Sequence, residues 1–299
     1  MWQLIGIVGV FVAVIAGYTI AGGNLGVVLA ALGPELLTIL GSGTMTLLIA
    51  NEISTVRSAA AGLGRIFAGA RWRKTDYTDA LCLMFLLVRV ARQEGNVVLE
   101  RHIDNPGAST IFSQYPRLCA NPAFLSFTTD VFRSITMNFT DSHKVGEMME
   151  TEIEKRLQEE MRAAKALNTL ADALPALGIV AAVLGVIKAM GAIAESPEVL
   201  GHMIGSALVG TFLGVFLSYG LLGPVAGRLR GMIEEEGLML AMVRQVIMSH
   251  LEGLAPQLAV EVGRKSVPTR LQPSFEELDQ LTSETARNAR ARAGAGAGA

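Results

Sequence analysis

The sequence predicts an all-α membrane protein in which four transmembrane helices form two hairpins, with a helical cytoplasmic domain inserted between the second and third helices. Of the 299 residues, 51% are hydrophobic and only 17% are charged, against roughly 25% charged residues in soluble domains. The apolar residues also gather into runs long enough to cross a bilayer, which takes about 20 residues in a helix. This composition excludes a plain soluble enzyme and a disordered chain. The net charge of −2 offers no attraction to nucleic acid.

The first predicted hairpin covers residues 1–51, with spans at about 4–20 and 34–51. The first 34 residues contain no Asp, Glu, Lys or Arg, and a glycine-rich turn too short to hold a domain separates the two apolar runs. Glu35 is expected at the outer end of the second span. A cleaved signal peptide is the less favoured alternative for this region, because no Lys or Arg precedes the first apolar run.

The second predicted hairpin covers residues 171–224, with spans at about 172–192 and 201–223. The sequence Glu-Ser-Pro-Glu forms the turn between them. Lys188 lies near the end of the first of these spans, where a lysine can extend its amine to the lipid headgroups. The fourth span contains no formal charge, so both segments are compatible with a bilayer.

The distribution of Lys and Arg predicts how the spans are oriented. Basic residues near span ends mark the cytoplasmic side of a membrane protein. Neither short turn carries Lys or Arg, so we expect the turns outside and both termini in the cytoplasm. The basic residues that follow the second and fourth spans are Arg57, Arg65, Arg71, Arg73, Lys74, Arg228 and Arg230.

Residues 52–170 form the predicted cytoplasmic helical domain, which is dense in balanced charge, with 15 Lys or Arg and 14 Asp or Glu. Amphipathic periodicity predicts helices at 78–92 and at 143–170, the second of which runs straight into the third span. A further cytoplasmic helix is expected at 225–255. The tail at 256–299 is expected to be largely disordered, since it ends in an Ala-Gly repeat of low complexity.

Small residues recur at helical spacing in the third and fourth spans. In lipid, such residues mark the faces on which helices approach one another closely. We therefore expect a helix contact, with a smooth lining for a pore as the alternative. The residues are Gly178, Ala182, Gly185, Ala189 and Ala192 in the third span, and Gly201, Gly205, Gly210, Gly214 and Ser218 in the fourth.

No ionisable side chain is expected in the middle of any span. Ion transfer through hydrocarbon normally needs such a group, and Thr211 is polar but cannot carry a proton at an accessible pH. His202 is expected at the outer interface. If the chain takes part in ion flow, a partner must therefore supply the carboxylate.

Pro175 and Pro224 stand near the inner ends of the third and fourth spans. Each is compatible with a helix boundary, where proline is tolerated, or with a hinge. We expect the two prolines at the same membrane depth, where they could couple the membrane helices to the cytoplasmic helices.

Five stretches of the sequence together form a specific pattern, although any one alone would be a weak signal. They are LPALGIVAAVLGVI at 174–187, LVGTFLG at 208–214, SYGLLGP at 218–224, LERHIDNP at 99–106 and IFSQYPR at 111–117. With the order of the spans and the length of the loop, the pattern resembles the MotA family of flagellar stator proteins, a branch of the MotA/TolQ/ExbB proton channel family. The likeness covers roughly residues 1–255.

The resemblance implies a component of the flagellar motor in the bacterial inner membrane, without a cofactor, a nucleic-acid partner or an enzyme activity. Subunits of this family form a ring of five around the single transmembrane helices of a MotB dimer, and MotB carries the ion-binding Asp. Ion passage rotates the ring, whose cytoplasmic face pushes the rotor protein FliG. A carboxylate supplied by MotB agrees with its absence from the predicted spans.

The family's torque-transmitting charged pair maps onto Arg92 and Glu100, and its two functional prolines map onto Pro175 and Pro224. Exposed charges of opposite sign suit a contact that forms and breaks repeatedly, because they steer approach and cost little to separate. Without the resemblance, Arg92 and Glu100 would be interpreted as a solvated helix face.

The coupling ion is inferred from three channel-lining positions. Sodium-type relatives place Thr where this chain has Ala182, and a Thr pair where it has Gly210 and Thr211. Because Na⁺ needs several oxygen ligands and a proton needs only the partner's carboxylate, the loss of two hydroxyls favours H⁺.

Three alternatives are weaker. An energiser of the ExbB/TolQ type works on the same principle but lacks the opening hairpin. A solute transporter would need polar groups for its substrate inside the spans. A membrane enzyme would need a nucleophile with its base, a phosphate loop or a metal cluster, and none of these patterns is present in the sequence.

Overall fold

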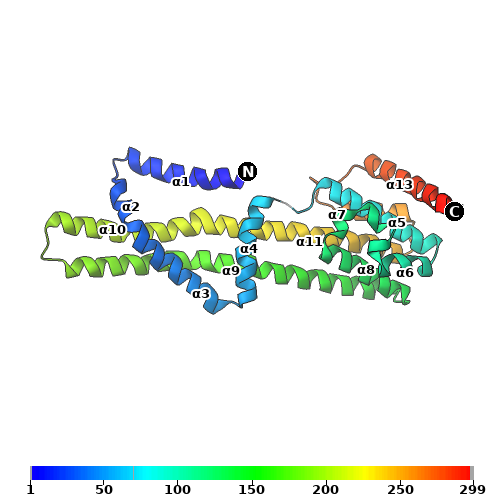
Figure 1. Cartoon of the computed structure of the whole chain (residues 1–299), viewed down its shortest axis with the longest axis horizontal. Helices are drawn as coiled ribbons and strands as arrows, with labels where there is room; N and C mark the ends of the chain where they lie inside the picture. The colour runs from blue at the N-terminus through cyan, green and yellow to red at the C-terminus, as the bar shows by residue number, and fades with distance from the viewer. Residues whose placement is uncertain (1, 70, 297–299) are drawn as a thin grey trace. The chain divides into compact units, whose positions relative to one another are not determined.

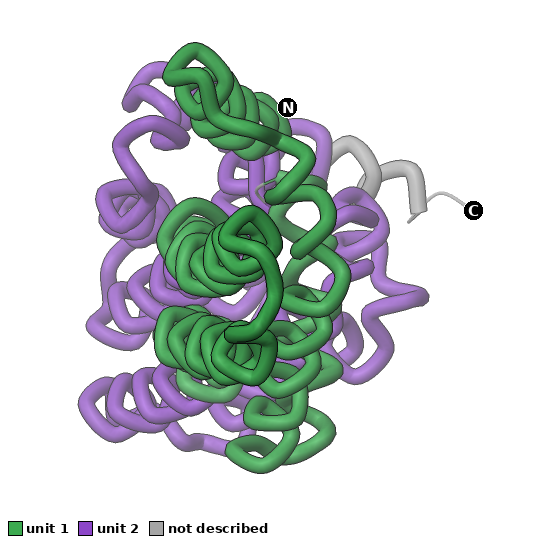
Figure 2. Tube along the Cα trace, turned by 90° about the vertical axis from the view of Figure 1, so that its left-hand side faces the viewer, with its two compact units in different colours: residues 1–69, 158–233 green, residues 70–157, 234–299 purple. Residues whose placement is uncertain are grey.

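The computed structural model describes residues 2–69 and 71–296, and these form helices and connecting turns without a strand (Figure 1). The chain divides into two compact units, unit 1 with residues 1–69 and 158–233, and unit 2 with residues 70–157 and 234–299 (Figure 2). Two long helices, α9 (Ser142–Gly191) and α11 (Gly223–Leu251), contribute residues to both units.

Unit 1 contains the apolar helices. Four helical runs are long and apolar enough to cross a membrane: Trp2–Ile20, Leu25–Ala50, Ser142–Gly191 and Pro197–Leu251. The fold class predicted from the sequence is thereby confirmed. The elements of this unit besides α9 and α11 are α1 (Trp2–Ile20), α2 (Leu25–Leu36), the π-helical η1 (Leu37–Gly41), α3 (Ser42–Ala50), α4 (Ile53–Ala68), α10 (Pro197–Val215) and the π-helical η4 (Phe216–Leu222).

The second apolar run begins at Leu25, nine residues before the expected start at residue 34. Asn24 sets this start, because its side chain accepts a hydrogen bond from the Gly26 N–H at 2.9 Å and caps the helix. The helix then continues through Pro34, which membrane helices tolerate when neighbouring groups satisfy the freed carbonyl. Glu35 therefore lies ten residues inside the run and not at its outer end.

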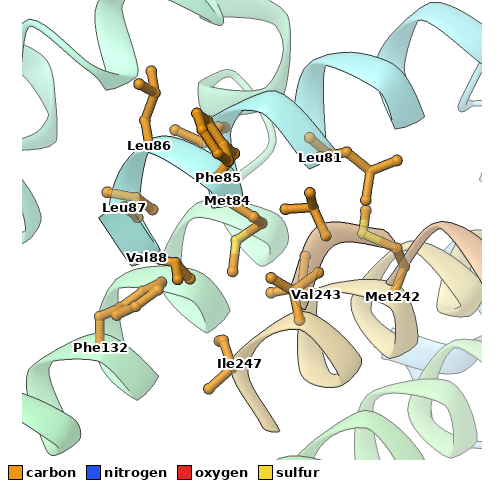
Figure 3. Close-up of a cluster of buried hydrophobic side chains, with 14 of the residues drawn as sticks. Leu81, Met84, Phe85, Leu86, Leu87, Val88, Phe132, Met242, Val243 and Ile247 are labelled. Atoms are coloured by element: carbon orange, nitrogen blue, oxygen red, sulfur yellow. The ribbon is translucent and has the colours of Figure 1, made fainter. Parts of the chain in front are cut away.

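The core of unit 2 surrounds α5 (Lys74–Gln93), which buries apolar side chains on all sides. Leu81, Phe85 and Val88 of this helix pack with Phe132 of α8 and Val243 of α11 (Figure 3). The remaining elements of the unit are α6 (Asn96–Asp104), η2 (Pro106–Ala108), η3 (Phe112–Gln114), α7 (Pro116–Cys119), α8 (Pro122–Thr136), α12 (Pro256–Lys265) and α13 (Phe275–Gly296).

The expectation of a largely disordered tail at 256–299 is wrong for 256–296, where α12 and α13 form. Val260 and Leu278 are buried in the core of unit 2. Arg264 donates to both carboxylate oxygens of Glu261, at 2.7 and 2.6 Å, and to the Pro273 carbonyl at 3.0 Å. The expected disorder of the last nine residues falls in part on residues 297–299, which lie outside the described residues.

Candidate functional site

The third and fourth membrane helices, α9 and α10, approach so closely that side chains would not fit between them. A Cβ built on Gly214 would lie 2.6 Å from the carbonyl oxygen of Leu174 and 2.8 Å from Cα of Gly178. A Cβ on Gly185 would lie 2.6 Å from Cβ of Ala207. Gly178, Gly185, Gly210 and Gly214 thus form a helix contact within one chain, as the sequence predicts. The prediction is wrong for two other members of the set, since nothing lies within 4 Å of a Cβ on Gly201, and a Cβ on Gly205 would meet Val27 of α2 at 3.5 Å.

Two of the predicted channel-lining residues meet at this crossing. A Cβ on Gly210 would lie 3.2 Å from the backbone nitrogen of Ala182 and 3.1 Å from Cβ of Ala181. Ala182 is only 9% exposed, whereas Thr211, the next residue of α10, is half-buried. Ala182 and Gly210 are therefore brought together inside the chain.

Glu35 lies at the same crossing, although the sequence predicts it at the outer end of the second span. A Cβ on Gly210 would lie 2.6 Å from Oε2 of Glu35. This oxygen is buried, and no hydrogen-bond donor reaches it among the residues that the structure describes. Gly210 lies nine residues inside the span predicted at 201–223, so the expectation of no ionisable group in the middle of a span is wrong.

One signal in the sequence could have placed Glu35 correctly. The residues between the glycine-rich turn and Pro34 are all apolar or glycine, and an apolar run that starts at Leu25 would have put Glu35 well inside the span. The span predicted at 34–51 begins nine residues too late, which puts Glu35 at its outer end.

Pro175 and Pro224 both lie within continuous helical stretches. Pro175 is inside α9, so the helix-boundary interpretation is wrong for this residue, and its ring removes the hydrogen bond to the carbonyl four residues earlier. Pro224 follows η4, in which the Gly223 N–H donates to the Ser218 carbonyl across a widened turn. A widened turn of this kind is a common way to fit an irregularity into a helix.

The two prolines do not lie at the same depth. Leu174, the neighbour of Pro175, packs against Gly214, and Pro224 comes ten residues after Gly214 in the sequence. At 1.5 Å per residue this offset is about 15 Å. Any coupling through these prolines would therefore act at two separate levels along the helices.

Arg92 lies in the last turn of α5 and is bonded within its own unit. Its Nη1 donates to the carbonyl oxygens of Gly253 at 2.9 Å and Leu254 at 2.7 Å. These two carbonyls belong to the turn that follows α11, whose own end is closed by backbone bonds such as the one from the Leu254 N–H to the Ser249 carbonyl at 3.0 Å. Arg92 therefore ties the end of α5 to the turn between α11 and α12, while its side chain stays exposed.

His250, in the last turn of α11, shares the surroundings of Arg92. Its Nδ1 is buried and has no hydrogen-bond partner among the described residues. Burial lowers the pKa of His250, and the positive charge of Arg92 lowers it further. The imidazole is thus held in its neutral form beside the guanidinium.

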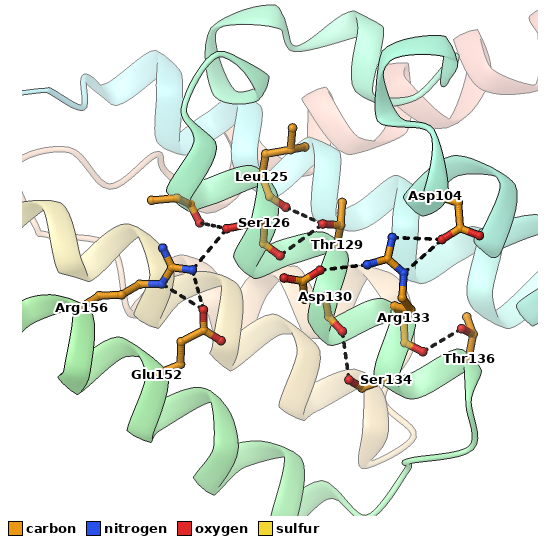
Figure 4. Close-up of polar contacts among 11 residues, drawn as sticks. Asp104, Leu125, Ser126, Thr129, Asp130, Arg133, Ser134, Thr136, Glu152 and Arg156 are labelled. Atoms are coloured by element: carbon orange, nitrogen blue, oxygen red, sulfur yellow. Dashed lines mark hydrogen bonds and ion pairs between the residues drawn. The ribbon is translucent and has the colours of Figure 1, made fainter.

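Glu100 is exposed on α6, and the structure does not pair it with Arg92. The short helix is fixed from beneath by Leu99 and Ile103, which are buried in the core of unit 2. At its C-terminal end, Arg133 of α8 donates from Nε and Nη2 to Oδ1 of Asp104, at 3.1 and 3.0 Å (Figure 4). The carboxylate of Glu100 is therefore exposed to solvent on a helix that is anchored at several points.

His102 provides a second anchor for α6. Its Nδ1 lies 2.8 Å from Oγ of Ser109. Burial lowers the pKa of His102, and the nearby charge of Glu94 opposes that shift. The described residues contain no group of three His, Cys, Asp or Glu side chains that could hold a metal ion.

Known proteins match nearly the whole chain. The motility protein A N-terminal family matches residues 4–95, and the MotA/TolQ/ExbB proton channel family matches residues 125–242. Motility protein A of Escherichia coli strain K12 is 37% identical over 280 residues, which is 94% of each chain. The chain belongs to the motility protein A family.

Another member of the motility protein A family, from Salmonella typhimurium, is 36% identical over 94% of each chain. The solved structure of C. jejuni MotAB is 18% identical with a TM-score of 0.72, covering 89% of this chain and 95% of that chain. The flagellar MotAB stator complex of Bacillus subtilis is 22% identical with a TM-score of 0.70, covering 91% of this chain and 98% of that one. At these identities the two structures show a shared fold.

The two family matches cover most of the candidate residues. Glu35 and Arg92 lie in the motility protein A N-terminal match. Glu100 lies between the two matches. The residues within the proton channel match are Pro175, Ala182, Gly210, Thr211 and Pro224.

Proposed function

We propose that this chain is the stator subunit that drives flagellar rotation by conducting H⁺ across the bacterial inner membrane together with a MotB dimer. The single observation that carries the proposal is 37% identity to the Escherichia coli motility protein A over 94% of both chains. Membership of this family makes the chain a component of an ion channel that powers motility.

A MotB-type partner is supported by the two structural neighbours, which are both MotAB complexes. The crossing of α9 and α10 contains no hydroxyl at Ala182 or Gly210, and fewer oxygen ligands favour H⁺ over Na⁺, which needs several of them. We infer that the ion is H⁺ and that an Asp of the partner binds it. Five copies of this chain would surround the partner helices, with both termini in the cytoplasm.

Torque transmission is assigned to two exposed residues of unit 2, Glu100 on α6 and Arg92 on α5. A charged face fixed on a packed core suits repeated contact with a rotor protein such as FliG, because exposed ion pairs form quickly and break at little cost.

The energiser of the ExbB/TolQ type is disfavoured by the first hairpin. That hairpin is part of the motility protein A N-terminal match at residues 4–95. An outer-membrane energiser would be expected to match the proton channel segment alone.

The test is to express the chain with its MotB-type partner in cells that lack their own stator, and to measure swimming speed. We expect swimming that persists without sodium and stops when an uncoupler dissipates the proton gradient. Strict dependence on sodium would contradict the choice of H⁺. A membrane-assembled complex that gives no rotation would contradict the stator function itself.

A further inference from the structure

We propose that Glu35 is a second proton-binding site on the ion path, supplied by this chain and distinct from the carboxylate of the partner. This inference rests on the proposed function, because it assigns a residue to the conduction of H⁺. The site consists of the Glu35 carboxyl group and the space that the missing side chain of Gly210 leaves for it.

The depth of Glu35 follows from its contact with α10. Leu25 begins the helix that carries Glu35, and ten residues of helix span about 15 Å, half the thickness of a bilayer core. Gly210, which faces Oε2 of Glu35, lies thirteen residues after Pro197, the start of α10. Both helices therefore place the carboxyl group near the middle of the membrane.

Among the residues that the structure describes, no basic side chain forms a hydrogen bond with Oε2 of this carboxyl group. Apart from Glu35, the described part of α2 contains no titratable residue. The titratable residues of α10, which packs against α2, are Glu198 and His202 near its outer end. His202 is eight residues, or about 12 Å along the helix, from Gly210. Two further helices of unit 1 carry titratable groups. In α1, the Tyr18 hydroxyl donates to the Asn24 carbonyl. In α9, Asp172 and Lys188 lie toward opposite ends of the membrane span.

An unpaired carboxylate is very costly in hydrocarbon, whereas a protonated carboxyl group is tolerated. Glu35 therefore holds a proton in the resting chain. Its Oε2 is buried against α10, while the residue as a whole is half-buried. The exchange step is the release of this proton to the carboxylate of the partner and the uptake of another from the outer side, with no other bond formed or broken.

Gly210 gives the site its specific shape. Any side chain at this position would occupy the space of Oε2, since a Cβ alone would lie 2.6 Å from it. Gly210 also packs against Ala182 where α9 and α10 cross. The carboxyl group therefore lies beside two of the predicted channel-lining positions. This proximity is the reason to place Glu35 on the ion path and not on a lipid-facing surface.

The first experiment uses the assembled complex with its partner in membrane vesicles and treats it with dicyclohexylcarbodiimide, which modifies protonated carboxyl groups in apolar surroundings. Mass spectrometry of the digested chain should find the adduct on Glu35, and the modified fraction should fall as the pH is raised. Absence of the adduct on Glu35 would overturn the proposal. Protection by sodium at constant pH would also overturn it, because the bound ion would then be Na⁺.

The second experiment compares swimming of Glu35→Gln, Glu35→Asp and the matched control Glu198→Gln, which removes an exposed carboxylate near the outer end of α10. We expect loss of swimming in Glu35→Gln, partial retention in Glu35→Asp and wild-type swimming in the control. Wild-type swimming of Glu35→Gln would overturn the second site while leaving the stator function intact. A wild-type complex that fails to rotate would contradict the stator function, and the carbodiimide reaction would still report on Glu35.

Discussion

The guanidinium of Arg92 donates a hydrogen bond of 2.7 Å to the backbone carbonyl of Leu254, 162 residues further along the chain. Arg92 thus has two tasks: it holds the turn that follows α11, and it keeps an exposed positive charge on unit 2. Glu100 has no comparable internal bond among the described residues. The two members of the predicted charged pair should therefore respond differently to mutation.

Reversing the charge of Glu100 should impair torque without affecting the fold. Glu100→Lys changes an exposed carboxylate on a helix that Leu99 and Ile103 hold in place. We expect strongly reduced swimming with an unchanged amount of membrane-assembled complex. The matched control is Glu154→Lys, an equally exposed charge reversal on α9, which should swim like the wild type. Loss of assembly in Glu100→Lys would show that the residue is structural.

Removing Arg92 should impair torque and also loosen unit 2. Arg92→Ala deletes both hydrogen bonds to the turn that follows α11, and we expect a loss of about 1 kcal/mol in the free energy of unfolding. Arg92→Lys keeps the charge and can retain one bond, so it should recover stability in part. Denaturant unfolding of the purified protein in detergent checks this order. Equal stability of Arg92→Ala and the wild type would show that these bonds do not stabilise unit 2.

The crossing of α9 and α10 should tolerate no side chain at Gly214. In Gly214→Ala the new methyl group would meet backbone atoms of Leu174 and Gly178, which cannot move aside without bending the helix. We expect a destabilisation of about 1–3 kcal/mol and reduced yield of the assembled complex. Gly191→Ala, at the end of α9 where nothing lies within 4 Å of a new Cβ, should leave thermal stability and yield unchanged.

The C-terminal helix α13 should contribute to the stability of unit 2. Leu278→Ala removes a side chain that is 3% exposed, and large-to-small changes at buried sites cost about 2–5 kcal/mol. Leu258→Ala, on the neighbouring α12 but 57% exposed, should cost much less. Comparable unfolding midpoints for the two variants would show that α13 does not pack as described.

Mild acid should weaken unit 2 through two half-buried histidines. The pKa of His250 is lowered in the folded chain by burial and by Arg92, and the unfolded chain has the ordinary value of about 6.5. The unfolded state therefore binds protons more readily, so stability is lost as the pH falls below about 6.5. The lowered pKa of His102 acts in the same direction.

Hydrogen exchange at the end of α11, measured at about pH 7.5 and about pH 5.5, checks this effect. The protection factor, which corrects for the slower intrinsic exchange of amides in acid, should fall at the lower pH in the wild type and fall less in His250→Asn, which cannot become charged. An equal fall in both would assign the effect to other groups.

The membrane architecture could be predicted from the sequence because its signals are local. Apolar run length identifies the spans, and the spacing of residues such as Gly178 and Gly185 identifies the face on which α9 meets α10. The depth of a single residue in the membrane was harder to predict. The predicted span begins at residue 34, which puts Glu35 at the surface, whereas the helix begins at Leu25, directly after its cap Asn24.

The contacts within unit 2 could not be predicted from the sequence for a different reason. The partners of Arg92 at Gly253 and Leu254 depend on how α5 and α11 pack, which no local pattern encodes. The tail is likewise polar overall. Its few buried side chains, such as Val260 and Leu278, can be identified as core residues only once the rest of the unit 2 core, against which they pack, is known.

The packing of α13 against α5 has a practical consequence for optical measurements on the motor. Arg89 of α5 donates to the Ala286 carbonyl at 3.2 Å, and Ala289 also packs against the core. A dipolar fluorophore attached rigidly to α13 would therefore share the orientation of the helix that carries Arg92. Polarised emission from such a label would report the angular steps of the subunit directly, without a bead or a tethered filament.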